Sequence, residues 1–94
     1  MKYDIILTTA FKRELKLIKK RKKDLEKLNK IVDMLANDEE IDAKYRDHAL
    51  ANSTRFKNCR ELHIEPDWLL VYKKNKNELI LFLMETGTHS DLFN

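Results

Sequence analysis

The chain has 94 residues, a formal net charge of +3 and a hydrophobic fraction of 43%. This length predicts a single domain over residues 1–94, and the apolar fraction excludes a disordered chain. We expect a cytoplasmic protein, because no run of about 18 apolar residues indicates a membrane span, no leader resembles a signal peptide, and the lone Cys59 cannot form an internal disulfide.

Positive charge is concentrated in the first third of the chain. Residues 12–30 hold ten basic and three acidic side chains, so the rest of the chain is net acidic. A concentrated positive field attracts RNA, DNA or an acidic partner. The alternative interpretation is a solvated, lysine-rich helix face.

The first half of the chain predicts a strand and two helices. Residues 3–7 favour a short strand, and Thr8 or Thr9 is suited to cap a helix whose apolar residues recur from Phe11 to Ile18. Asp24 can cap a second helix with an apolar stripe over residues 25–35. The break between the helices is expected within residues 19–24. Residues 37–40 end the second helix and open a polar segment of about twenty residues, a length that suggests a functional loop.

The second half predicts strands. Residues 60–64 alternate, which puts Leu62 and Ile64 on one face and Glu61 and His63 on the other. A turn at residues 66–67 leads to an apolar run over residues 68–72, typical of a strand covered on both faces, in which Trp68 is a core residue. A hairpin turn at 74–77 precedes a last strand over residues 79–84. We therefore predict an α+β fold, with two N-terminal helices packed on a small, mainly antiparallel β-sheet whose other face carries the histidines.

The three histidines all lie in short polar motifs of the second half. His63 is near Glu61 and four residues before Asp67, and a carboxylate beside an imidazole orients it for acid–base chemistry. The alternative is a surface histidine on a solvated strand. His48 follows Asp47 in a loop, where it can instead pack or cap locally. His89 follows Gly87 in a tail that we expect to fold back, so that Phe93 either stacks on a base or anchors the tail.

Four cations are expected near these histidines, where they can hold phosphates or stabilise a pentacoordinate transition state: Arg46, Arg55, Lys57 and Arg60. Arg60 is the least direct of these, because alternation puts it on the face of Leu62 and Ile64. The spacing of the histidines and Asp67 matches no compact metal motif, and Cys59 is isolated. No metal or other cofactor is therefore expected.

Together these motifs resemble the RelE/ParE toxin superfamily, and within it the YafQ-like branch. The matching segments are residues 45–50 (YRDHAL), 59–72 (CRELHIEPDWLLVY) and 86–93 (TGTHSDLF), and the resemblance covers nearly the whole chain. The histidine set points to the YafQ-like branch, because other RelE-like branches use mainly arginine, lysine and tyrosine. The resemblance implies a RelE-like fold and the toxin of a type II toxin–antitoxin system. It further implies a ribosome-dependent endoribonuclease that cuts mRNA in the decoding site, and an antitoxin encoded alongside.

Carried onto matching positions, the resemblance implies five catalytic residues: His48, His63, Asp67, His89 and Phe93. Glu61, where close relatives can carry Asp or Cys, and Arg60 are supporting groups, and Trp68 is structural. The RNA- and ribosome-binding residues are then expected to be Lys19, Lys20, Lys22, Lys23, Arg46, Arg55 and Lys57.

In the implied reaction the 2′-hydroxyl attacks the scissile phosphate and the 5′-oxygen leaves. We expect His89 to be the principal acid or base, with His63 and Asp67 as its partner pair, while His48 positions phosphate or assists proton transfer. The spacing leaves open which residue is the acid and which is the base. We expect the antitoxin to offer acidic side chains and apolar anchors. Two alternative functions are a ParE-like, gyrase-directed toxin and a non-catalytic RNA-binding module that depends on the lysines alone.

Overall fold

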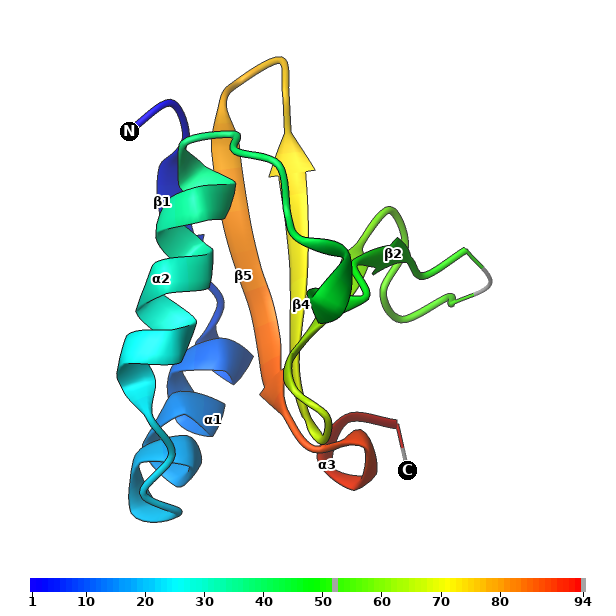
Figure 1. Ribbon diagram of the computed structural model, residues 1–94. Helices are drawn as coiled ribbons and strands as arrows, with labels where there is room; N and C mark the ends of the chain where they lie inside the picture. Colours follow the sequence, from blue (N-terminus) through cyan, green and yellow to red (C-terminus); the bar gives the residue numbers. More distant parts are fainter. Residues whose placement is uncertain (52, 94) are drawn as a thin grey trace.

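The computed structural model describes residues 1–51 and 53–93. Its elements run, in chain order, β1 (Asp4–Leu7), α1 (Thr9–Lys20), α2 (Leu25–Ala36), the 3₁₀ turn η1 (Ala43–Tyr45), β2 (His48–Ala49), β3 (Arg60–Glu65), β4 (Trp68–Asn75), β5 (Ile80–Gly87) and α3 (His89–Phe93) (Figure 1). The strands form one sheet in the order β1-β5-β4-β3-β2, in which β1 is parallel to β5 and the other neighbours are antiparallel. The predicted α+β class is confirmed.

Both predicted helices are present, and their N-caps explain where they begin. The Thr8 hydroxyl accepts a hydrogen bond from the Phe11 amide at 3.0 Å, and the Asp24 carboxylate accepts one from the Glu26 amide at 3.0 Å. The chain turns between the helices at Lys22, whose φ of 57° lies in the left-handed region. The break thus falls within the predicted stretch.

The main core lies between the helices and one face of the sheet. In Figure 1 both α1 and α2 lie on the same side of the strands. Phe11, Ile18 and Ile31 from the helices pack with Leu62 and Leu70 from the sheet. Trp68, only 1% exposed, belongs to this core. Its indole nitrogen donates to the Thr86 hydroxyl at 2.9 Å, which satisfies the one polar atom that its burial removes from water.

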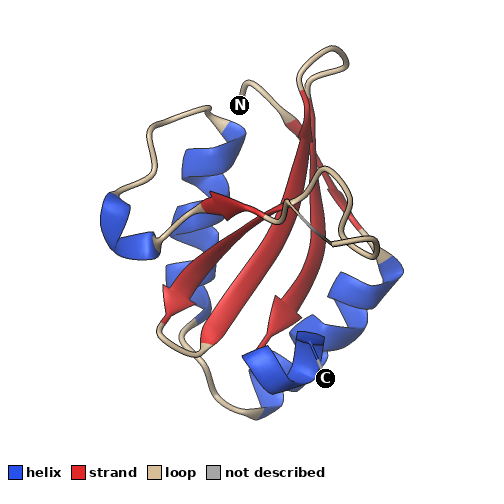
Figure 2. Ribbon diagram, turned by 90° about the vertical axis from the view of Figure 1, so that its right-hand side faces the viewer, coloured by secondary structure: helices blue, strands red, loops and turns tan. Residues whose placement is uncertain are grey.

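The opposite face of the sheet, which is toward the viewer in Figure 2, carries a smaller core. Leu69 and Val71 of β4 pack there with Phe56, Cys59 and, from α3, Leu92. The central strand β4 is therefore covered on both faces, as its apolar run predicts. The C-terminal tail folds back as expected, but as the short helix α3.

The outer edge of β5 extends beyond β1, whose pairing ends at Leu83. Two side chains of the α1 region bond this edge: the Thr8 hydroxyl donates to the Met84 carbonyl at 2.6 Å, and the Glu14 carboxyl accepts from the Thr86 amide at 3.1 Å. Burial, followed by a hydrogen bond with Glu85, raises the pKa of Glu14 to about 8. In the part of the chain that the structure describes, no helix is long and apolar enough to cross a membrane.

Candidate active site

The pairing of β2 with β3 brings two histidines to one carboxylate. His48 lies opposite Glu61 in the register of these strands, and alternation puts His63 on the same face as Glu61. Glu61 Oε1 is 3.6 Å from His48 Nε2 and 3.7 Å from His63 Nε2. The Glu61 side chain is 5% exposed, whereas that of His48 is 51% exposed. A buried carboxylate so placed can stabilise the imidazolium that forms when either ring takes up a proton.

Arg46 connects these two histidines. It follows η1 with a φ of 50°, in the left-handed region, and its carbonyl oxygen lies 2.8 Å from His48 Nδ1. A carbonyl only accepts hydrogen bonds, so Nδ1 of His48 carries a proton and Nε2 is the nitrogen that is free to take one. The Arg46 guanidinium lies 3.4 Å from His63 Nδ1.

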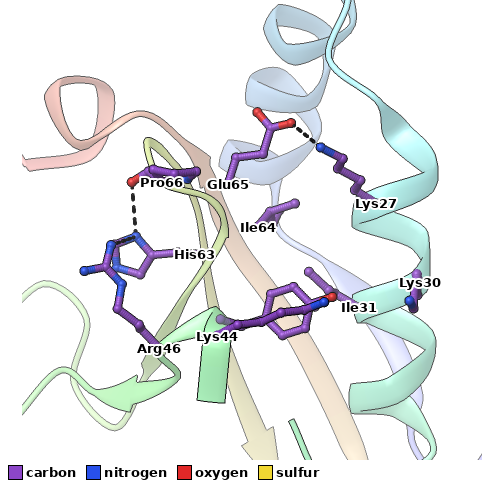
Figure 3. Close-up of a pocket in the computed structure, with 10 residues that line it drawn as sticks. Lys27, Lys30, Ile31, Lys44, Arg46, His63, Ile64, Glu65 and Pro66 are labelled. Carbon is purple, nitrogen blue, oxygen red and sulfur yellow. Dashed lines mark hydrogen bonds and ion pairs between the residues drawn. The ribbon is translucent and has the colours of Figure 1, made fainter. Parts of the chain in front are cut away.

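His63 Nδ1 has two possible partners. It lies 3.3 Å from the carbonyl oxygen of Pro66, an acceptor, and 3.4 Å from Nη2 of Arg46, a donor (Figure 3). The first contact needs a proton on Nδ1 and the second needs a lone pair there, so only one forms at a time. Either tautomer of His63 is therefore compatible with its surroundings, a useful property for a residue that transfers protons.

A second group of predicted site residues surrounds α3. The Asp67 carboxylate accepts a hydrogen bond from the backbone amide of His89 at 3.1 Å. The ring centroids of His89 and Phe93 are 5.1 Å apart, and those of Phe93 and Phe56 are 5.7 Å apart in an edge-on arrangement. Phe93 thus touches both the exposed His89 and the smaller core. In this arrangement Asp67 positions the His89 backbone. The sequence-based expectation is that Asp67 pairs with His63.

The start of α3 is fixed by a capping box formed by Thr88 and Asp91. The Asp91 carboxylate accepts from the Thr88 amide at 2.9 Å, and the Thr88 hydroxyl accepts from the Asp91 amide at 3.1 Å. A β-carbon at Gly87 would lie 2.8 Å from Asp91 Oδ2, so a larger residue there would have to displace that carboxylate from the capping box. The Arg21 guanidinium donates two hydrogen bonds to the Asp91 carboxylate, at 2.7 and 3.2 Å. This interaction holds the pKa of the Asp91 carboxyl well below its usual range.

The two groups meet at the turn between β3 and β4. Pro66 contacts the His63 ring through its carbonyl oxygen, and the next residue, Asp67, holds the first residue of α3. The loop between α1 and α2 reaches the same end of the sheet, because Arg21 binds α3 and Lys23 binds Glu65 at 3.0 Å. The turn between β3 and β4, α3 and the basic loop therefore lie at one end of the molecule, whereas β2, which begins at His48, lies about halfway along the sheet (Figure 1).

The predicted cations have different surroundings. The Arg55 guanidinium donates two hydrogen bonds to the Glu85 carboxylate, at 2.6 and 2.8 Å, and one to the Leu92 carbonyl at 2.8 Å. Arg55 therefore links α3 to β5. Arg60 is bonded to Asp47 at 3.1 Å, and alternation turns it away from His63. Lys57 is exposed near Ala49, and the predicted lysines Lys19, Lys20 and Lys22 are exposed as well. Among residues 1–51 and 53–93, no group of three or more His, Cys, Asp or Glu side chains is arranged to hold a metal ion.

Comparisons with known proteins extend over almost the full chain. A family model described as "Bacterial toxin of type II toxin-antitoxin system, YafQ" matches residues 3–94. The chain is 40% identical over 91 residues to an mRNA interferase toxin YafQ of Escherichia coli strain B / BL21-DE3, which covers 96% of this chain and 95% of the relative.

Solved structures agree with this match. The chain is similar to the toxin in the Escherichia coli DinJ–YafQ complex, with a TM-score of 0.87 and 39% identity over 98% of this chain and 99% of the other. It is also similar to a metal-bound toxin from Helicobacter pylori, with a TM-score of 0.89 and 41% identity over 97% of this chain and 99% of the other.

Proposed function

Since the chain belongs to the YafQ family of toxins from type II toxin–antitoxin systems, we propose that it is a ribosome-dependent endoribonuclease that cleaves mRNA by histidine acid–base catalysis. The observation that carries the proposal is the placement of two imidazoles beside one buried carboxylate, Glu61, at 3.6 and 3.7 Å. A relative at 40% identity is named an mRNA interferase, which supports RNA as the substrate.

In the proposed reaction a 2′-hydroxyl of the mRNA attacks the adjacent phosphate and the 5′-oxygen leaves, which yields a 2′,3′-cyclic phosphate and a 5′-hydroxyl. Attack of water on the cyclic phosphate then gives a 3′-phosphate. One histidine takes the 2′ proton and another protonates the leaving oxygen. His89 and His63 are the principal pair, and His48 assists transfer or positions phosphate. Glu61 stabilises whichever imidazolium forms beside it, while Asp67 and Phe93 hold His89 in place.

In this reaction, cationic side chains stabilise the negative charge that develops on the pentacoordinate phosphorane. Arg46 is the best placed, because its guanidinium is 3.4 Å from His63 Nδ1 and no carboxylate in the described residues forms an ion pair with it. Arg55 and Arg60 are bonded to Glu85 and Asp47, so each acts on the site mainly through the elements it anchors. Histidine proton transfer and cationic stabilisation require no metal ion.

The basic segment formed by the end of α1 and the loop after it supports action on the ribosome. Lys19, Lys20 and Lys22 are exposed, and the Arg21–Asp91 bond joins their segment to α3, which carries His89. Positive charge beside the reacting groups draws a polyanion to them, and contacts with ribosomal RNA would hold the enzyme over the decoding site in the cytoplasm. The same surface suits an antitoxin with acidic side chains and apolar anchors. A similar toxin forms the DinJ–YafQ complex, which supports such a partner.

The test is expression of the chain alone, followed by primer extension on mRNA from the arrested cells. Growth should stop, and new 5′ ends should appear within translated codons, whereas co-expression of the small adjacent gene should prevent both effects. Cleaved fragments should carry a 5′-hydroxyl, which polynucleotide kinase labels without prior phosphatase treatment. Growth arrest without mRNA cleavage, accompanied by loss of plasmid supercoiling, would instead identify a gyrase-directed toxin.

A further inference from the structure

A pocket of about 490 Å³ opens beside His63, between α2, η1 and β3. Figure 3 shows Lys27 and Lys30 of α2 on one side of it and Arg46 and His63 on the other. Of the residues that line it, the catalytic mechanism proposed above uses only Arg46 and His63. The volume lies within the range of roughly 300–1,000 Å³ that is typical of sites for small ligands.

The charge of the pocket is strongly positive. Among the described residues that line it, Glu65 is the one carboxylate, and Lys27 and Lys23 already bind it at 2.8 and 3.0 Å. These lysines lower the pKa of Glu65, which keeps its carboxylate ionised, so the carboxylate offsets one of the two lysine charges. The exposed Lys30, Lys44 and Arg46 form no ion pair with any carboxylate of the described chain. Three uncompensated cations therefore surround one opening.

The floor and one wall of the pocket are apolar. Ile31 of α2 and Ile64 of β3 are buried beneath it, and the half-buried ring of Tyr45 forms part of the wall. The ammonium group of Lys44 lies 5.2 Å from the centre of the Tyr45 ring. Cations beside an aromatic and aliphatic surface are the combination with which proteins hold single-stranded RNA: the cations bind phosphates, and the bases lie against the apolar wall.

We propose that this pocket is a nucleotide subsite for the cleaved mRNA strand, in which Lys30 and Lys44 bind a phosphate that flanks the scissile one. The inference rests on the proposed endoribonuclease function. His63 belongs both to the histidine group and to the pocket wall, so a strand with its scissile phosphate at His63 continues directly into the pocket. Arg46 then lies between the two phosphates, and Tyr45 with its apolar neighbours receives the ribose or base between them.

The experiment measures the affinity of the toxin for ribosomes programmed with a short mRNA. A 2′-deoxynucleotide at the cleavage site removes the attacking hydroxyl, so affinity is read without cleavage. Single mRNA phosphates on either side of the site are replaced in turn by neutral methylphosphonates. Each mRNA is tested with the parent, with Lys30→Ala/Lys44→Ala, and with Lys76→Ala. Lys76 is an exposed lysine in the turn between β4 and β5, at the other end of the sheet, and serves as the control for loss of a lysine outside the pocket.

The double variant should bind the unmodified mRNA complex roughly tenfold or more weakly than the parent, because it loses hydrogen bonds between charged groups. One flanking methylphosphonate should weaken the parent to a similar extent, and the double variant should lose little further affinity on that mRNA. Lys76→Ala should behave as the parent does. Melting curves should match those of the parent, because Lys30 and Lys44 are exposed.

An unchanged affinity of the double variant would overturn the proposal. So would losses that simply add for every methylphosphonate, since the lysines would then bind ribosomal RNA or another part of the complex. Failure of the proposed function is distinguished by a separate reading: the parent would fail to cut the same mRNA when the 2′-hydroxyl is present. The affinity results do not depend on that cleavage.

Discussion

Truncation of Leu92 tests whether the docked position of α3 matters for catalysis. Leu92 is 1% exposed and is the one buried side chain among the described residues of α3, where it packs with Phe56, Leu69 and Val71. Burial of a leucine side chain stabilises by about 1.5–3 kcal/mol, and Leu→Ala changes in cores cost about 2–5 kcal/mol. We therefore expect Leu92→Ala to weaken docking of α3 by about 2 kcal/mol, which shifts its docking equilibrium about 30-fold.

The assay is single-turnover cleavage on programmed ribosomes, together with amide hydrogen exchange of α3. The rate for Leu92→Ala should fall by up to about 30-fold, and the α3 amides should exchange faster than in the parent. Leu17→Ala is the matched control, because that leucine is 41% exposed on α1 and its truncation should change neither quantity. Loss of exchange protection in α3 with an unchanged cleavage rate would refute the idea that α3 must be docked for catalysis.

Three further predictions follow from the other contacts. Between about pH 5 and pH 8 the free energy of unfolding should fall as pH rises, because unfolded glutamate loses its proton near pH 4.3 whereas Glu14 in the folded protein holds its proton up to about pH 8. In thermal denaturation followed by circular dichroism, Glu14→Gln should flatten this dependence and Glu78→Gln, an exposed control, should not. Glu61→Gln should slow single-turnover cleavage at least roughly tenfold with little loss of ribosome affinity, since it removes the charge that stabilises the imidazolium; cleavage at the parental rate would exclude that role. Lys19 and Lys20 end α1, and Lys22 lies in the loop after it. Reversal of these three exposed lysines to Glu should abolish ribosome co-sedimentation at moderate salt without a change in melting temperature. Unchanged co-sedimentation would exclude them from ribosome binding.

The helices and the central strands were predictable because their signals are local. The caps at Thr8 and Asp24 and the apolar spacing of each helix lie within a few residues of one another, and the continuous apolar run of β4 requires cover on both faces. Alternation within β3 likewise placed Glu61 and His63 on one face. The strand β2 was not predicted, because a strand of only two residues carries no periodicity and is defined by its pairing with β3.

The parts of the site that were missed depend on contacts between distant residues. His48 approaches Glu61 because of the register between β2 and β3. The ion pair between Arg21 and Asp91 joins residues 70 positions apart in the chain. Neither is visible in local spacing, nor is the bond of Asp67 to the His89 amide. One local signal for α3 was present, however: Thr88 and Asp91 have the spacing of a capping box, which predicts a helix start at His89.

The central claim is that histidines transfer the protons of RNA cleavage, and His89 tests it most directly. Single-turnover cleavage on programmed ribosomes should be compared for the parent, His89→Ala and His89→Gln. Both variants should lose about 10²–10⁴-fold in rate, because an amide keeps hydrogen bonds but cannot carry a proton at neutral pH. Their melting temperature and ribosome affinity should stay near those of the parent, since the side chain is exposed. A His89→Gln protein that cuts within a few-fold of the parental rate would contradict the account.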